Sequence, residues 1–369
     1  MERNDRYSRH YRLSGFGEVA QTKLQSGRVL VVGAGGLGCP ALQYLVAAGV
    51  GKIGIIDHDR IELSNLQRQV LFGTNEIGLY KAEIAAAKLR LLNPEIDIRE
   101  YVLHLSTENA VELVEGYDVV LDCTDNFATR YLLSDLCALL GKPLVFGAIY
   151  KYEGQIAVFN VADDNGVKTT YRHLFPLPPD PLDAPDCNEV GVLGVLPGII
   201  GTMQATEAIK LLTGVGQPLC NKLMTINLLD NRSMVLDIPE TLSKVAVYPT
   251  SLSHFEAFGY DDHCGITTPS VHRISPQEFM EICQGNGILV VDVRNVDEQP
   301  KLPFEHVQIP LQELPDNVEK IDRNHVIVVC QSGKRSQFAG EFLREKLGAD
   351  CRVSHLEGGV AALEIYSNG

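Results

Sequence analysis

The sequence lacks paired cysteines. Its nine cysteines are an odd number, and none of them belongs to a C-x-x-C pair. This absence argues against a disulfide framework and a tetrathiolate zinc site, because both need cysteines at matched spacings. Reduced thiols of a cytosolic protein fit the pattern better, so we expect any reactive cysteine to act singly.

The chain is also short of positive charge. Its 32 basic residues face 47 acidic ones, which gives a net charge of −15. Binding to nucleic acid phosphates needs a basic face, so nucleic acid is not expected as the main partner. A basic protein partner remains open.

Signals for export and for membrane insertion are missing as well. The first residues, MERNDRYSRHYRL, have neither the apolar core nor the cleavage site of a signal peptide. One apolar stretch, Val29 to Val50, is interrupted by clustered glycines and by Pro40, so it indicates a strand, a turn and a helix. We therefore expect a cytoplasmic protein without a membrane partner.

What the sequence does contain is an alternation of short apolar runs with helical patterns from Arg28 onward. This order predicts a Rossmann-like, doubly wound α/β sheet with crossover helices on both faces. After Gly154 the strand patterns GQIAVFN, KLMTINLLD and RSMVLDI predict an antiparallel continuation of that sheet.

The 369 residues are enough for two domains. We expect the first over residues 1–250, a linker over residues 251–270 and a small α/β domain over residues 271–369. Ser275 followed by Pro276 predicts a helix start in the second domain, as N-cap and first helical residue. The proline-dense segment from His173 to Asn188 predicts a mobile loop.

A glycine-rich turn follows the first strand. Gly33, Gly35 and Gly38 fit G-x-G-x-x-G, and Asp57 ends the next strand 19 residues after Gly38. Such glycines let the backbone approach phosphates, and the aspartate can bind ribose hydroxyls. This motif alone leaves a dinucleotide dehydrogenase and an ATP-dependent enzyme equally open.

The polar residues after Asp57 favour ATP. The segment and the helix start after it carry a set of polar side chains that suits a triphosphate with Mg²⁺, namely Asp59, Asn65, Arg68, Gln69 and Lys81. A nicotinamide ring needs no such set, whereas departing pyrophosphate needs cations and amide donors to offset its charge.

Carboxylates at the end of a later strand complete this prediction. In LDCTDN, Asp122 and Asp125 lie at the ligand-binding edge of the expected sheet, with Asn126 beside them. Mg²⁺ usually takes one or two protein carboxylates plus phosphate oxygens, so we expect Asp125 to bind it.

These motifs together resemble the ThiF/MoeB/HesA family of ubiquitin-activating-type adenylyltransferases, over roughly residues 5 to 250. The matching segments include RYSRHYRL, VVGAGGLGCPALQYLVAAGVG, IIDHDRIELSNLQRQ, GAIYKYEGQIAVF and GVLGVLPGIIGTMQATEAIK. The resemblance implies that Gly36 lines the ATP site and that Asp57 holds ribose. It further implies that Asn65, Arg68 and Lys81 hold phosphates, that Asp125 binds Mg²⁺ or orients the α-phosphate, and that Arg9 reaches into the partner's site of a homodimer.

Two cysteine-containing segments can be compared with the corresponding segments of this family. Cys187 follows the proline-rich segment, and the resemblance implies that it attacks an acyl-adenylate or forms an acyl persulfide. Many members hold zinc with two C-x-x-C pairs, but these places read TYRH and DHCG here. The candidate ligands that remain are too few for a tetrathiolate site, so we expect no structural zinc, and a mixed His/Cys/Asp site stays open as the alternative. These candidates are His173, His263 and Cys264, with Asp261 or Asp262 as weak additions.

In the second domain, VVCQSGKRSQFA places Cys330 after a buried strand, before a polar loop and a helix. Loop amides, Lys334 and Arg335 would favour an anionic sulfur there. This segment, with VVDVRNVDEQ and HLEGGVAAL, resembles a single-domain rhodanese, although the usual GHI-GA segment is degenerate as FEHVQIPL. The resemblance implies a persulfide on Cys330, cradled by Gln331, Ser332, Gly333, Lys334 and Arg335.

The joined prediction is an ATP-dependent adenylyltransferase with a sulfurtransferase domain. It would adenylate the C-terminal glycine of a ubiquitin-like sulfur carrier and, with a persulfide donor, produce a thiocarboxylate. The carrier could serve molybdopterin, thiamine, a thiolated tRNA or a sulfur-containing metabolite. Two alternatives stay open: an NAD-dependent oxidoreductase, and a non-catalytic scaffold that binds a ubiquitin-like protein.

Overall fold

The computed structural model describes residues 5–163, 165–179, 191–264, 271–283, 287–321, 323–348 and 351–367. The described residues up to Cys264 form one compact unit, and those from Val271 onward belong to a second. Among the helices within these ranges, none combines the length and the apolar character needed to cross a membrane.

The first unit is built on one eight-stranded sheet with the order β3-β2-β1-β4-β5-β6-β7-β8. The pairs from β3 to β5 are parallel and those from β5 to β8 antiparallel, which confirms the predicted continuation. The strands are β1 (Arg28–Val32), β2 (Lys52–Ile56), β3 (Asp97–Tyr101), β4 (Val119–Asp122), β5 (Leu144–Tyr150), β6 (Glu153–Phe159), β7 (Lys222–Asn227) and β8 (Arg232–Asp237).

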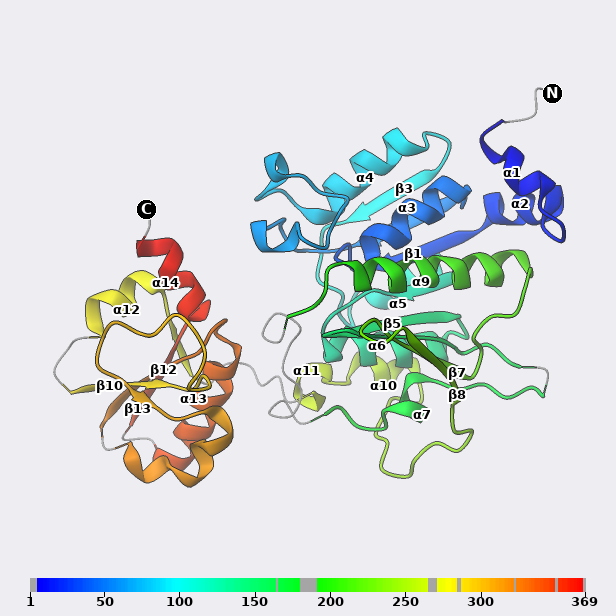
Figure 1. Cartoon of the computed structure of the whole chain (residues 1–369). Helices are drawn as coiled ribbons and strands as arrows, with labels where there is room; N and C mark the ends of the chain where they lie inside the picture. The colour runs from blue at the N-terminus through cyan, green and yellow to red at the C-terminus, as the bar shows by residue number, and fades with distance from the viewer. Residues whose placement is uncertain are drawn as a thin grey trace. The chain divides into compact units, whose positions relative to one another are not determined.

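Helices cover both faces of the parallel half of this sheet (Figure 1). Side chains alternate along β1, so Val29 and Val31 pack with α3, α4 and α9, while Leu30 and Val32 pack with α5 and α6 on the other face. The helices are α1 (Ser8–Arg12), α2 (Gly17–Ser26), α3 (Gly38–Ala48), α4 (Lys81–Leu92), α5 (Ala110–Glu115), α6 (Phe127–Leu139), α7 (Tyr171–Leu174), α9 (Val195–Thr213), α10 (Leu252–Glu256) and α11 (Tyr260–His263).

Parallel pairing brings three strand ends to one edge of the sheet. Val32, the last residue of β1, lies opposite Ile56 of β2 on one side and Asp122 of β4 on the other. The glycine loop, Asp57 and the turn with Asp125 follow these ends directly. The fold therefore gathers the three predicted nucleotide segments.

The segment from residue 251 to 264 belongs to the first unit, although we expected a linker there. Helices α10 and α11 pack on α6, and Phe255, Tyr260 and Cys264 are buried in the same core as α6. The segment has no long periodic pattern because two very short helices, anchored by single aromatic side chains, make these contacts. The expected mobile loop begins inside α7, and its residues 180–188 lie outside the described ranges.

The second unit is a five-stranded parallel sheet with the order β11-β10-β12-β13-β9. Val326 and Val328 pack toward α13, while Ile327 and Val329 pack toward α12 and α14. Ser275 caps α12 by accepting a hydrogen bond from the backbone of Glu278, as predicted. The elements are β9 (His272–Ile274), α12 (Pro276–Ile282), β10 (Ile288–Asp292), β11 (Val307–Gln308), β12 (His325–Val329), α13 (Lys334–Leu347), β13 (Arg352–Leu356) and α14 (Gly359–Ser367).

The docking of α10 on the first unit can be tested with Phe255→Ala. Because this ring is fully buried, its removal should lower the free energy of unfolding of the first unit by about 3–5 kcal/mol. The matched variant Leu252→Ala, on the same helix and 38% exposed, should cost less than about 1 kcal/mol. Calorimetry of the whole chain measures both, and equal effects would contradict the packing of this segment.

Candidate functional site

The glycine loop is held close to neighbouring backbone. Gly33 has a φ of +97°, and a Cβ atom there would lie 2.6 Å from the carbonyl oxygen of Cys123. A Cβ on Gly38 would lie 1.9 Å from the carbonyl oxygen of Gly33. No side chain fits at either position, so the loop presents bare backbone at the start of α3, as phosphate binding requires.

The segment around Arg68 lies over this loop. A Cβ on Gly36 would be 3.5 Å from Cδ of Arg68, and one on Gly35 would be 3.6 Å from Nε2 of Gln69. The amide of Gln69 is buried, and its Oε1 has no hydrogen-bond partner within the described ranges. A polar group that is buried without a partner is costly, so a ligand donor at this position would be stabilised.

Asp57 ties the glycine loop to the end of β2. Its Oδ2 accepts a hydrogen bond of 2.7 Å from the amide of Ala34, and its Oδ1 accepts one of 2.8 Å from the amide of Asp59. Burial raises the pKa of Asp57, and the nearby charge of Lys81 opposes that shift. Asp57 thus orients the glycine loop through Oδ2 and its own turn through Oδ1, and each oxygen keeps a lone pair for a ribose hydroxyl.

Lys81 and Asn65 both follow Asp59 in the sequence, and both are buried. The ammonium of Lys81 forms a 2.7 Å ion pair with Asp59, at the first residue of α4. Asn65 accepts a 3.2 Å hydrogen bond from the amide of Glu62 and so closes its own turn. Together with the loop, these donors and Arg68 fit a triphosphate.

Asp125 and Asn126 are exposed at the end of β4. The side chain of Asn126 accepts a 2.9 Å hydrogen bond from the amide of Thr129, so this residue caps α6. Within the described ranges no hydrogen bond or ion pair involves the carboxylate of Asp125. Asp125 is therefore available to a ligand, whereas the side-chain oxygen of Asn126 is already used to cap α6.

Asp122 is the last residue of β4, but its carboxylate is buried and does not face the ligand-binding edge, contrary to the sequence prediction. It is fully buried, its Oδ2 lies 3.2 Å from Nε of Arg130, and its Oδ1 accepts from the amide and the hydroxyl of Thr124 at 3.0 and 2.6 Å. Arg130 also donates to the carbonyl of Thr124 at 2.8 Å. These bonds form a brace that fixes the residue immediately before Asp125.

Sequence reasoning missed this brace. A usable signal was present, since Arg130 is the one basic residue in the apolar pattern of α6. Gln204 of α9 supports the same turn from the other face, where its Nε2 donates to the carbonyl of Asp122 at 2.7 Å. Its partner could not be read from the sequence, because 82 residues separate the two.

Arg9 is not near the glycine loop of its own chain. It is exposed on α1, whose neighbour Tyr7 packs against Gly49 at the far end of α3 and accepts a 2.9 Å hydrogen bond from Asn93. The glycine loop lies at the opposite end of α3, so one protomer does not bring Arg9 and the loop together.

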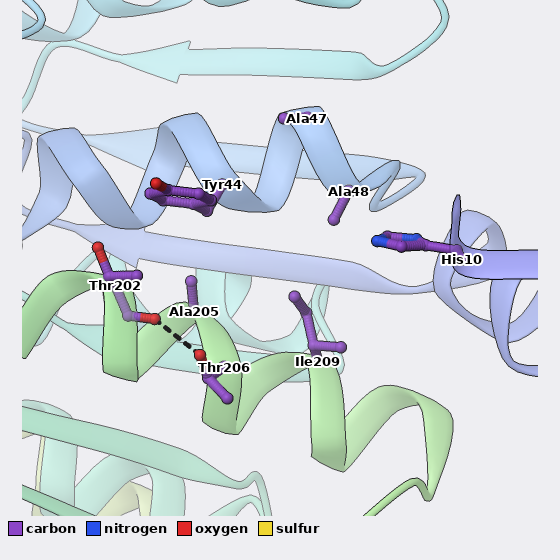
Figure 2. Close-up of a pocket in the computed structure, with 8 residues that line it drawn as sticks. All are labelled: His10, Tyr44, Ala47, Ala48, Thr202, Ala205, Thr206 and Ile209. Carbon is purple, nitrogen blue, oxygen red and sulfur yellow. Dashed lines mark hydrogen bonds between the residues drawn. The ribbon is translucent and has the colours of Figure 1, made fainter. Parts of the chain in front are cut away.

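A cavity of about 250 Å³ lies between α3 and α9, away from the nucleotide residues (Figure 2). Tyr44 and Ala48 of α3 face Thr202 and Ile209 of α9, and His10 of α1 closes one end. None of the residues lining it belongs to the predicted nucleotide site.

The two places where many family members hold zinc are joined here by a buried arginine. Arg172 is 1% exposed, donates to Asp135 at 3.1 and 2.8 Å, and places Nη1 2.8 Å from Nε2 of His263. Burial raises the pKa of the Cys264 thiol to about 12, and the guanidinium of Arg172 against His263 opposes a second cation at this place. His173 instead accepts from the amide of Thr170 at 3.0 Å. These donors do not fit zinc, and no metal-binding group of three such residues occurs in the described part of the chain.

In the second unit, Cys330 follows β12 and its side chain is fully buried. The amide of Gly333 donates to its Sγ at 3.1 Å, and Gly333 reaches this position with a φ of +92°. The carbonyls of Cys330 and Gln331 accept from the amides of Val360 and Ala361 at 2.8 and 3.1 Å. The segment after β13, which begins EGGV at Glu357, therefore supports the cysteine loop, and this loop directs the amide of Gly333 toward the sulfur.

Side chains of the cysteine loop form hydrogen bonds with residues that follow β10. Arg335 forms two hydrogen bonds of 2.8 Å with the two carboxylate oxygens of Glu298, and Arg294 donates to Gln331 at 3.2 Å. Ser332 is half-buried, and the side chain of Lys334 lies outside the described part. Arg335 was expected to add positive charge near the sulfur, and Glu298 offsets that charge.

The first unit is a doubly wound sheet with this glycine loop, and the second is a parallel sheet with a cysteine loop after β12. Together they define a two-domain enzyme that acts on a nucleotide and on sulfur. The ThiF family matches residues 7–245, and the rhodanese-like domain matches residues 275–365. The chain belongs to the ThiF family and carries a rhodanese-like domain. It is an enzyme of the adenylyltransferase and sulfurtransferase class.

Relatives along most of the chain agree with this. A probable adenylyltransferase/sulfurtransferase, MoeZ, of Mycobacterium tuberculosis is 38% identical, over 97% of this chain and 92% of that protein. The adenylyltransferase and sulfurtransferase MOCS3 of Arabidopsis thaliana is 40% identical, over 92% and 79%. A sulfur carrier protein adenylyltransferase of Thermus thermophilus is 45% identical, over 72% and 98%.

Solved structures share the fold. The crystal structure of E. coli MccB with ATP superposes with a TM-score of 0.55 and 22% identity, over 67% of this chain and 75% of that one. At this identity the likeness concerns the fold alone.

The brace around Asp122 can be tested by removing its cation. Arg130→Met leaves Asp122 buried without a counter-charge and should lower the free energy of unfolding by about 3–5 kcal/mol. In the matched variant Arg28→Met, the lost pair with Asp118 is largely exposed, so the cost should be about 0–1 kcal/mol. Denaturant unfolding of both variants checks this, and a cost for Arg130→Met no larger than that for Arg28→Met would refute the brace.

Proposed function

We propose that the first unit adenylates the C-terminal carboxylate of a ubiquitin-like sulfur carrier with ATP. The observation that carries the proposal is the meeting of the glycine loop with Arg68, Gln69 and Lys81 beside an exposed Asp125. A nicotinamide ring does not call for these cations, which weighs against an oxidoreductase. The names of the relatives support both reactions of the joined chain.

The residues present fit ATP with Mg²⁺. Backbone amides of the glycine loop, with Asn65, Arg68 and Lys81, would hold the phosphates, and Asp57 would accept from the ribose. Bound Mg²⁺ would supply charge neutralisation for the triphosphate, and Asp125 is the carboxylate available to it. The brace from Asp122 and Arg130 keeps the backbone before Asp125 in one place.

The chemistry follows from the carrier's carboxylate, which is a poor electrophile at neutral pH. Its oxygen attacks the α-phosphate, pyrophosphate leaves, and the acyl-adenylate has AMP as a good leaving group. Arg68 and Lys81 offset the charge that develops on the departing pyrophosphate. The terminal sulfur of the Cys330 persulfide then attacks the acyl carbon and AMP leaves, which gives an acyl disulfide with Cys330. A second thiolate attacks the Cys330 sulfur, and the thiocarboxylate leaves with the electron pair of the broken S–S bond. The disulfide that remains is reopened by a thiol reductant.

Further parts of the proposal concern Arg9, Cys187 and the partners of the protein. We assign Arg9 to the active site of a partner in a homodimer, because it lies far from the loop of its own chain. Cys187, which lies outside the described residues, is kept as an accessory thiol that accepts the acyl group. A carrier ending in Gly-Gly, a persulfide donor and a cytoplasmic setting, with a molybdopterin or thiamine pathway, complete the assignment.

The adenylation half is tested by Asp125→Ala. This exposed side chain makes no contact that supports the fold, so the variant should stay folded and lose ATP–pyrophosphate exchange by about 100-fold or more. The matched variant Asp97→Ala, also exposed but at the start of β3, should exchange normally. Full exchange by folded Asp125→Ala enzyme would remove this residue from the mechanism.

The sulfur half is tested by Cys330→Ala. The variant should still adenylate the carrier, but the carrier should no longer gain sulfur in place of oxygen, because its immediate source is gone. Mass spectrometry of the carrier after incubation with ATP and donor measures this. Cys351→Ala, in the same unit, serves as the control and should behave as wild type. Wild-type thiocarboxylate formation without Cys330 would place the sulfur source elsewhere.

A further inference from the structure

Glu298 pairs with Arg335, the last residue of the cysteine loop from Cys330 to Arg335. Its two carboxylate oxygens each accept a 2.8 Å hydrogen bond from Arg335, and the side chains are 26% and 17% exposed. Oε1 of Glu298 also accepts a 2.8 Å hydrogen bond from the amide of Asn295, so a bond other than those to Arg335 holds the carboxylate in place. Two parallel bonds to a fixed acceptor give a guanidinium one defined orientation.

This pair persists at neutral pH. The hydrogen bonds from Arg335, which outweigh the opposing effect of burial, hold the pKa of Glu298 below its usual value. The other described guanidinium at the loop, Arg294, is fully buried and forms a fork with Asp292 at 3.0 and 2.8 Å. Each of these two cations around the sulfur loop is thus offset by its own carboxylate.

The charge matters because sulfur donors differ in charge. With thiosulfate, the Cys330 thiolate attacks the outer sulfur, a new S–S bond forms, and sulfite leaves with the electron pair of the broken S–S bond. A dianion must then approach a thiolate, which needs local positive charge. With a low-molecular-weight persulfide, the terminal sulfur is transferred and a thiolate leaves, and the donor carries less negative charge.

We propose that Glu298 sets the donor specificity of Cys330 by masking the charge of Arg335, which disfavours small dianionic donors such as thiosulfate relative to persulfides. The proposal rests on the proposed sulfur transfer at Cys330 and names its donor class. Glu298 is a positioning residue here, since it acts on the donor through Arg335.

The test compares two single-charge removals at adjacent positions in the full-length chain. Glu298→Gln should raise kcat/KM for thiosulfate roughly tenfold, the scale of one charge acting over about 10 Å at an effective dielectric constant of about 20. Its kcat/KM for cysteine persulfide should change much less. Asp297→Asn removes the neighbouring exposed carboxylate, which makes no contact with Arg335, and should leave both values near wild type.

Two further measurements keep the outcome decisive. The double variant Glu298→Gln/Arg335→Gln should lose the gain for thiosulfate, because no charge remains to be exposed. Alkylation of Cys330, read by peptide mass spectrometry, should show a several-fold higher iodoacetate-to-iodoacetamide rate ratio in Glu298→Gln than in wild type.

The alkylation ratio separates this inference from the proposed function. If the wild-type chain transferred sulfur from neither donor, the proposed sulfur transfer would fail, yet the ratio would still report the charge at Cys330. An unchanged ratio and an unchanged thiosulfate kcat/KM in Glu298→Gln, or equal changes in Asp297→Asn, would overturn the inference.

Discussion

The proposed nucleotide site depends on the parallel pairing of β1 with both β2 and β4. That register places the ends of three strands side by side, with Val32 opposite Ile56 and Asp122. Each strand then delivers one element: the glycine loop, Asp57 and the turn with Asp125. A shift of one residue in either pairing would turn every side chain of a strand to the other face and separate these elements.

Both units favour an anion by the same means, which is backbone N–H at the start of a helix that follows a buried parallel strand. In the first unit the loop before α3 carries no side chains at its closest contacts, so phosphates can approach. In the second unit the amide of Gly333 reaches the sulfur of Cys330. Charged side chains refine these sites: Arg68 and Lys81 in one, and the Arg335–Glu298 pair in the other.

The sequence was sufficient for the parallel strands and their antiparallel continuation, for the glycine loop and for the position of Cys330, because each has a local signature of periodicity and turn residues. It was insufficient for the brace of Arg130, for the Arg172–His263 contact and for the Arg335–Glu298 pair. Those partners lie 8, 91 and 37 residues apart. Their pairing depends on how strands and helices pack. The local sequence therefore shows that a charged residue is present but does not show which residue it pairs with. The same limit explains why Asp122 and Asp125 looked alike until burial separated them.

The central claim is that the carrier's carboxylate is activated as an acyl-adenylate and then receives sulfur. A carrier whose C-terminal carboxylate is labelled with ¹⁸O on both oxygens tests it directly in a single turnover with ATP and a persulfide donor. The account predicts one labelled oxygen in AMP and the other retained in the thiocarboxylate, measured by mass spectrometry. Unlabelled AMP, with the label recovered in inorganic phosphate or lost to water, would contradict it.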